Sequence, residues 1–156
     1  MNKRGYSCIA LDNPNFDSNV GGALRAAQCY GADLAVISGD KFKKESTDTM
    51  KAYKHIPTIL GKNIFDNLPY DCIPVAVDLI EGAIALPKYG HPERAFYIFG
   101  PENSTLGKEI TDRCQDIVYV PTEFCMNLAA TVNVVLYDRL FKSRNYKAVE
   151  EIISHG

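Results

Sequence analysis

The chain has 156 residues, of which 46% are hydrophobic and 23% charged, and its formal net charge at pH 7 is -2. This composition can bury a core and excludes a disordered tail, and the balanced charge excludes a generally polybasic nucleic-acid binder. No apolar run is long enough to span a bilayer, and the first one, residues 8–11, is too short for a signal peptide. We therefore expect a single domain over residues 1–156 that acts in the cytoplasm without a membrane.

The predicted elements alternate between short apolar runs and helical stretches, which is typical of an α/β domain with a largely parallel sheet. In the first helix we expect Asn19 at the N-cap and Gly31 as the left-handed residue after the end. A last helix over residues 127–141 is apolar on more than one side, which indicates burial against the sheet and against a partner subunit. A weak final helix or a frayed end is expected over residues 145–156. Six strands are expected, at residues 6–11, 34–37, 57–60, 73–77, 95–99 and 117–120, and short helices at residues 63–67 and 107–113.

Common nucleotide and metal motifs are not found in the sequence. The stretch from Gly100 to Glu109 has six residues between its glycines and a glutamate after the lysine, so it fails the P-loop pattern. No G-x-G-x-x-G follows a strand, the five cysteines form no C-x-x-C pair, and the three histidines are scattered. We therefore expect no bound metal.

Three polar segments follow predicted strands and precede helix starts, which is where parallel α/β sheets bind ligands. Each segment alone has an ordinary structural explanation as a cap, a turn or a loop. The three together, in this order, indicate a functional site more specifically than any one of them does. They are residues 13–27 with Asn19 and Arg25, residues 96–103 with Gly100 and Glu102, and residues 118–132 with Pro121 and Asn127.

The sequence resembles the SpoU (TrmH-like) branch of the SPOUT RNA methyltransferases. The resemblance lies in three motifs in this order: Asn-x-Gly-x-x-x-Arg, Gly-x-Glu after a strand, and Met-Asn-Leu at the start of the long helix over residues 127–141. The resemblance runs from Tyr6 to about Tyr146 and is closest to the small, single-domain TrmL-like members that methylate a ribose of the tRNA anticodon. It implies an α/β/α domain with a parallel sheet and a C-terminal deep trefoil knot, a rare exception to the rule against knots. It also implies a homodimer with the active site at the subunit interface.

The resemblance implies transfer of a methyl group from S-adenosylmethionine to a ribose 2′-hydroxyl of RNA, which leaves S-adenosylhomocysteine. Arg25 is the expected catalytic residue, and its permanently protonated guanidinium suggests an electrostatic role in place of general base catalysis. Asn19 and Glu102 are expected to hold Arg25 and the ribose, and Asn127 to close the site. The expected cofactor wall consists of Val77, Asp78, Phe99, Gly100, Val120, Pro121, Cys125, Met126 and Leu128.

Apolar members of this wall are expected to sandwich the adenine. Phe99, Val120 and Met126 are suited to that contact, and Gly100 would let the backbone approach it closely.

Two positions depart from the family pattern. Cys125 stands where serine is usual, and Thr105 where a second glycine is common. Cysteine is a weak hydrogen-bond partner, so these departures keep open a catalytically silent knotted module that binds RNA or a protein. An rRNA 2′-O-methyltransferase and an enzyme that methylates a base nitrogen are further alternatives.

Two groups of basic residues are candidates for holding RNA, with tRNA as the expected substrate. One lies between residues 41 and 54 and includes Lys51 and Lys54, and the other includes Arg139 and Lys142 around the end of the helix predicted over residues 127–141. If these groups flank the site in a dimer, they could hold phosphates despite the acidic total charge.

Overall fold

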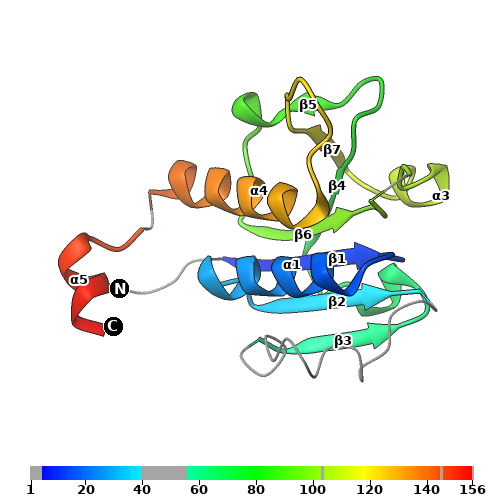
Figure 1. Cartoon of the computed structure of the whole chain (residues 1–156). Helices are drawn as coiled ribbons and strands as arrows, with labels where there is room; N and C mark the ends of the chain where they lie inside the picture. Colours follow the sequence, from blue (N-terminus) through cyan, green and yellow to red (C-terminus); the bar gives the residue numbers. More distant parts are fainter. Residues whose placement is uncertain (1–4, 40–55, 103, 145, 156) are drawn as a thin grey trace.

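The computed structural model describes residues 5–39, 56–102, 104–144 and 146–155. The strands of this part of the chain form one parallel sheet in the order β3-β2-β1-β6-β4-β7-β5 (Figure 1). The predicted α/β class with a parallel sheet is confirmed, and the six predicted strands are found with small shifts at their ends. The strands are β1 (Tyr6–Asp12), β2 (Leu34–Ser38), β3 (Thr58–Gly61), β4 (Ile73–Val77), β5 (Ile84–Ala85), β6 (Arg94–Phe99) and β7 (Asp116–Tyr119).

Helices cover both faces of the sheet. Two long helices pack side by side on one face, and two short ones lie on the other (Figure 1). A short 3-10 turn precedes β6, and the last helix lies apart from these layers. The helical elements are α1 (Asp17–Cys29) and α4 (Leu128–Ser143) on the first face, η2 (Ile64–Asn67) and α3 (Lys108–Thr111) on the second, then η3 (Leu86–Lys88) and α5 (Val149–His155).

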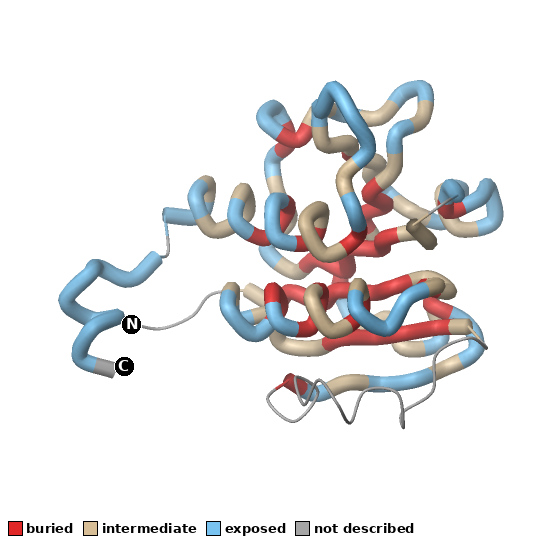
Figure 2. Tube along the Cα trace, in the orientation of Figure 1, coloured by how far each residue is buried: buried red, intermediate tan, exposed pale blue. Residues whose placement is uncertain are grey.

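The buried residues follow the two-residue period of the strands. In β1, Ile9 and Leu11 belong to the core under α1 and α4, whereas Cys8 and Ala10 belong to the core on the opposite face. The tube in Figure 2 shows this burial concentrated in the central strands and on the inner sides of the two long helices. A sheet buried on both faces needs apolar side chains in both directions, which explains the continuous apolar runs in the sequence.

A close contact joins α1 to α4. A Cβ atom on Gly22 would lie 2.7 Å from the Cβ of Ala129, which is closer than real Cβ atoms approach. The glycine therefore lets the N-terminal halves of the two helices approach each other closely.

The expected N-cap of α1 is wrong. The helix begins at Asp17 with Phe16 at the N-cap position, and Asn19 lies inside the first turn. Glu102 fixes the chain before the helix instead: its carboxylate accepts from the side-chain amide of Asn19 at 2.9 Å and from the backbone N–H groups of Asn15 and Phe16. The expected end is confirmed, because Gly31 follows the helix with a φ of 70°.

The order of the strands in the sheet differs from their order in the chain at β7. This strand lies between β4 and β5, although both of them precede it in the chain. A chain that enters a space bordered by earlier strands in this way fits the threaded path that the resemblance implies.

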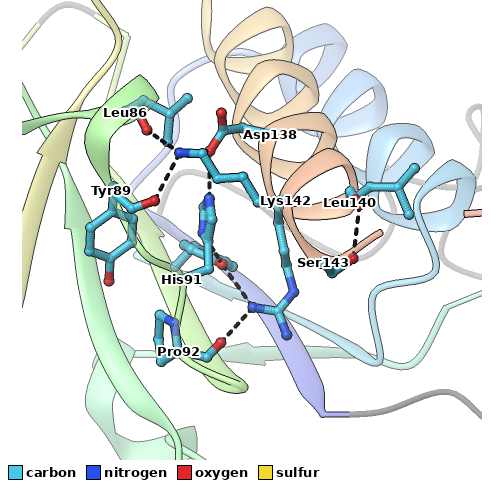
Figure 3. A network of polar contacts seen from close by, with 10 residues as sticks. Leu86, Tyr89, His91, Pro92, Asp138, Leu140, Lys142 and Ser143 are labelled. Atoms are coloured by element: carbon cyan, nitrogen blue, oxygen red, sulfur yellow. Dashed lines mark hydrogen bonds and ion pairs between the residues drawn. The ribbon is translucent and has the colours of Figure 1, made fainter. Parts of the chain in front are cut away.

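A polar network ties α4 to the segment before β6 (Figure 3). The carboxylate of Asp138 accepts from Nζ of Lys142 at 2.8 Å and pairs with Nε2 of His91 at 2.7 Å. Nδ1 of His91 lies 2.7 Å from the hydroxyl of Tyr97. Lys142 also donates to the carbonyls of Leu86 at 2.6 Å and Tyr89 at 2.8 Å, which occupies all three of its ammonium protons.

Arg139 belongs to the same network. Its guanidinium donates to the carbonyls of Pro92 and Glu93, both at 2.8 Å, and to the hydroxyl of Tyr97 at 3.0 Å. Arg139 and Lys142 were expected to hold RNA. The structure gives them a structural role instead, because their donors are directed at oxygens of the protein itself.

The network predicts a loss of stability in acid. Burial lowers the pKa of His91 from 6.5 and outweighs the hydrogen bond to Asp138, which raises it. Below about pH 6.5 the unfolded chain therefore binds a proton more readily than the folded one, so stability falls as the pH falls from there toward the folded pKa. We expect urea unfolding to show a smaller loss of stability between pH 7 and pH 5 for His91→Gln than for the wild type. Equal losses would contradict the prediction.

Candidate functional site

The three polar segments identified in the sequence meet at one edge of the sheet. β1, β6, β4 and β7 are neighbours and parallel, so the residues that follow their carboxyl ends share that edge. The first and second segments touch through Asn19 and Glu102, and the first and third touch through Gly22 and Ala129.

Glu102 clamps the connection between β1 and α1. One carboxylate oxygen accepts from the backbone N–H of Asn15 at 3.0 Å, and the other accepts from the N–H of Phe16 at 3.2 Å and the side chain of Asn19. Partial burial acts to raise the pKa of Glu102, but these hydrogen bonds outweigh it and the pKa is lowered. Glu102 therefore stays ionised and fixes the start of α1.

Arg25 extends into solvent from α1. The residues on either side of it, Leu24 and Ala26, are buried, whereas Arg25 itself is exposed. Within the described residues its guanidinium makes no hydrogen bond and no ion pair, so the structure does not show the expected contacts of Asn19 and Glu102 with Arg25. This leaves a cation free to meet a ligand one turn beyond the contact between α1 and α4.

Asn127 caps α4. Its side-chain oxygen accepts from the backbone N–H of Ala130 at 2.8 Å, and its carbonyl accepts from the hydroxyl of Thr131 at 3.0 Å. The expected helix start at this residue is confirmed. The cap leaves the amide group of Asn127 without a partner among the described residues, so that group is available to a ligand.

Asn127 caps α4 through its side-chain oxygen and keeps its amide group available, so two substitutions should separate these roles. Asn127→Ala should lower the free energy of unfolding by about 1 kcal/mol, because the cap is lost. Asn127→Asp should keep the cap and its stability but lose the amide donor, so both variants should turn over slowly while their oligomeric state is unchanged. Thermal unfolding, size-exclusion chromatography and a methyl-transfer assay check this, and normal activity of Asn127→Asp would contradict it.

The expected cofactor wall lies along the ends of three adjacent strands. Asp78 follows β4 and links two of these ends: its N–H donates to the carbonyl of Val118 at 2.9 Å, and its carboxylate accepts from the N–H of Leu106 at 3.1 Å. The chain after β6 is therefore held to the end of β4 through Leu106 and to the start of α1 through Glu102.

The side chain of Phe99 does not line this wall, so its expected contact with adenine is wrong. It is 1% exposed in the core, and those of Val77 and Leu128 are 8% and 5% exposed. At these positions only backbone atoms can meet a ligand. Gly100 is half-buried, and a Cβ there would lie 3.3 Å from the side chain of Leu106, so the glycine lets Leu106 approach the end of β6 closely.

The loop before α4 has the features that the implied cofactor requires. Pro121 and Cys125 are exposed and Met126 is half-buried. Within the described part of the chain the backbone of residues 122–126 makes no hydrogen bond. Free amides and carbonyls beside strand ends can bind the polar groups of a nucleoside, so this edge fits a ligand held largely by backbone groups.

An apolar groove of about 540 Å³ adjoins the wall but coincides with it at only two residues, Val120 and Pro121. Its floor is the outward side of α4, where Val134, Tyr137 and Phe141 are 37%, 56% and 62% exposed. The sequence indicated this second apolar side of the helix. The groove is completed by Tyr30, Leu86, Pro87, Asn133 and Asp138.

The sequence did not identify the part that Asn15 and Phe16 play in the site. Both contribute backbone N–H groups to Glu102, and backbone donors leave no residue-type signal.

Lys51 and Lys54, which were expected to hold RNA, lie outside the described residues. No helix of the described chain is long and apolar enough to cross a membrane.

Comparisons with known proteins relate this geometry to one family. The sequence profile described as the SpoU rRNA Methylase family matches residues 7–137. The chain is 28% identical over 161 residues to the tRNA (cytidine/uridine/adenosine-2′-O-)-methyltransferase TrmJ of Pseudomonas aeruginosa, with 83% of the chain and 58% of that protein covered.

Solved structures show the same fold. The SpoU methyltransferase AviRb from Streptomyces viridochromogenes, in complex with AdoMet, aligns with a TM-score of 0.79 at 15% identity, over 94% of this chain and 61% of that one. A structure described as giving insights into the 2-OH methylation of C/U34 on tRNA aligns with a TM-score of 0.78 at 20% identity, over 93% of this chain and 95% of that one. The chain thus spans about three fifths of TrmJ and of AviRb.

Proposed function

Because the chain belongs to the SpoU methylase family, we propose that it transfers a methyl group from S-adenosylmethionine to a ribose 2′-hydroxyl of RNA. The observation that carries the proposal is the meeting of the three polar segments at the N-terminal halves of α1 and α4. Asn19, Glu102 and Asn127 come from distant parts of the sequence, and Arg25 lies further along α1 without a partner among the described residues.

In this proposal Arg25 acts on the ribose. The guanidinium orients the nucleotide through its phosphate and stabilises the alkoxide that develops at the 2′-oxygen as the hydroxyl proton leaves to water. Glu102 positions the start of α1, and the amide of Asn127 closes the site from α4. The family cofactor supplies the sulfonium methyl group when bound.

The cofactor would be held mainly by backbone groups. Asp78, Gly100 and Val120 follow three adjacent strands, and the unbonded backbone of residues 122–126 faces solvent beside them. Of the predicted apolar contacts, Val120 and Met126 keep partly accessible side chains. Cys125 lies exposed in the same loop, where its thiol can contact the ligand.

We propose tRNA as the substrate and TrmL-like methylation of the anticodon as the specificity. Both the TrmJ relative and the structure concerned with C/U34 are described as acting on tRNA, and the latter covers nearly the same chain length. The family description and a structure from Sinorhizobium meliloti name rRNA, which makes rRNA the second candidate. We further propose that residues 1–156 act as one methyltransferase domain in the cytoplasm.

The experiment is methyl transfer from tritium-labelled S-adenosylmethionine to separate pools of tRNA and rRNA. We expect label in tRNA and, after alkaline hydrolysis, in the resistant dinucleotides that a 2′-O-methyl group produces. Label in nucleobases would indicate a base methyltransferase. Cofactor binding without transfer to any RNA would indicate a silent binding module.

We propose in addition that two copies associate through the outward side of α4. Val134, Tyr137 and Phe141 recur at helical spacing along the groove, and Tyr137 packs edge-on against Tyr30 with ring centroids 6.2 Å apart. Large exposed apolar surfaces of this kind mark association sites.

This association predicts that Tyr137→Glu converts the dimer into a monomer and raises its dissociation constant by at least tenfold, because a charge would be buried at the contact. Light scattering after size exclusion measures the mass. Tyr70→Glu is the matched control, since Tyr70 is 92% exposed on the turn before β4. A dimeric Tyr137→Glu variant, or a wild type that is already monomeric, would contradict the proposal.

A further inference from the structure

Phe16 occupies a position where a phenylalanine is locally unfavourable. It is the N-cap residue of α1, makes no side-chain capping bond, and leaves its ring 57% exposed. Short polar residues are strongly preferred at N-caps, and two of them, Asp17 and Ser18, follow directly. Local rules are broken in this way mainly at functional sites.

The backbone of Phe16 is held on both sides. Its N–H donates to Glu102 at 3.2 Å, and its carbonyl accepts from the N–H groups of Asn19 and Val20, both at 3.2 Å. The exposed ring is therefore attached to a fixed point, one helical turn from Asn19 and within the segment that carries Arg25.

Phe124 and Tyr70, which are more exposed than Phe16, lack this combination, and Tyr137 and Phe141 belong to the groove on α4. Phe124 is 85% exposed, but it lies in the loop whose backbone makes no hydrogen bonds among the described residues. Tyr70 precedes β4 and so lies toward the amino ends of the strands, away from the site. Phe16 alone of these three joins an exposed ring to an anchored backbone at the site.

We propose that the ring of Phe16 is a stacking platform for the base of an unpaired nucleotide of the RNA substrate. The inference rests on the proposed function and adds a recognition residue to it. The proposed substrate is the tRNA anticodon, whose bases are not paired within the tRNA, and exposed aromatic rings bind unpaired bases by stacking. Stacking tolerates any base, so Phe16 selects unpaired RNA and not a particular sequence.

Phe16→Leu removes the aromatic face and keeps an apolar side chain at the helix start. Stacking contributes enough that we expect the KM for tRNA to rise about 5- to 150-fold. The turnover number and the affinity for S-adenosylmethionine should stay close to wild type, and Phe16→Trp should retain the wild-type KM. A Phe16→Leu variant with a normal KM for tRNA would overturn the inference, as would one whose affinity for S-adenosylmethionine falls while its KM for tRNA rises.

The chain contains no tryptophan, so Phe16→Trp also introduces a single fluorophore. We expect tRNA to quench its emission in the absence of S-adenosylmethionine, and a fully paired RNA duplex to leave it unchanged. Tyr70→Trp is the control and should not respond to tRNA. Quenching needs no methyl transfer, so it separates failure of this inference from failure of the proposed activity. Equal quenching by duplex, no quenching by tRNA, or emission that changes with protein concentration alone, as when a second copy covers the ring, would each overturn it.

Discussion

Arg25→Ala is expected to lower the rate of methyl transfer about 10²- to 10³-fold, the usual cost of removing one group that stabilises a developing oxyanion. The guanidinium is exposed and makes no hydrogen bond or ion pair within the described residues, so its removal should not disturb the packing of α1. The thermal midpoint and the dissociation constant for S-adenosylmethionine should therefore remain close to wild type. Single-turnover kinetics with tRNA measure the chemical step directly.

Two variants make the Arg25 experiment specific. Arg25→Lys keeps a positive charge but loses the planar fork of donors, so its rate should lie between those of the wild type and Arg25→Ala. Gln28→Ala changes an exposed side chain on the same helix and should be neutral. Unchanged transfer by Arg25→Ala would remove Arg25 from the mechanism, whereas a variant that no longer binds cofactor would show a structural role.

The sheet was predictable because its strands are buried on both faces. Runs such as residues 73–77 and 95–99 are apolar throughout, and this pattern does not depend on distant parts of the chain. β5 was missed because two residues, Ile84 and Ala85, carry no periodicity, and their pairing with β7 arises only in the folded chain.

The start of α1 shows why local rules can fail. Asn19 is a good cap by residue type, yet Glu102, more than eighty positions away in the sequence, binds both its side chain and the backbone before the helix. Asn127 has no such competitor and caps α4 as predicted. The start of α1 is set by a distant carboxylate that binds the chain before the helix, and sequence spacing does not reveal that partner.

The basic residues and Phe99 show the same limit. Arg139 and Lys142 have the sequence pattern of a solvated cationic surface, but backbone carbonyls before β6 bind their donors. Phe99 was placed at the site by the family resemblance, and the direction of its side chain puts it in the core. The sequence therefore predicted which segments meet at this edge of the sheet, but not which of their side chains are exposed there.

Glu102→Ala is expected to reduce stability and activity together. The change leaves the N–H groups of Asn15 and Phe16 and the side chain of Asn19 without their acceptor. Because the carboxylate is ionised and only partly buried, we expect a loss of about 1–3 kcal/mol in the free energy of unfolding. The start of α1 would also lose its fixed position, so the methyl-transfer rate should fall at least tenfold, as happens when positioned groups shift by small distances.

The pH dependence of the Glu102 contribution has a definite sign. Its pKa is lowered in the folded protein from 4.5, so the stabilisation is complete above that value and is lost as the pH falls toward the folded pKa. The stability difference between the wild type and Glu102→Gln should therefore shrink below about pH 4.5. Glu109→Gln, at an exposed glutamate of α3, is the matched control and should show no such difference. If urea unfolding found Glu102→Gln and Glu109→Gln equally stable at neutral pH, Glu102 would not be the residue that fixes the start of α1 at the site.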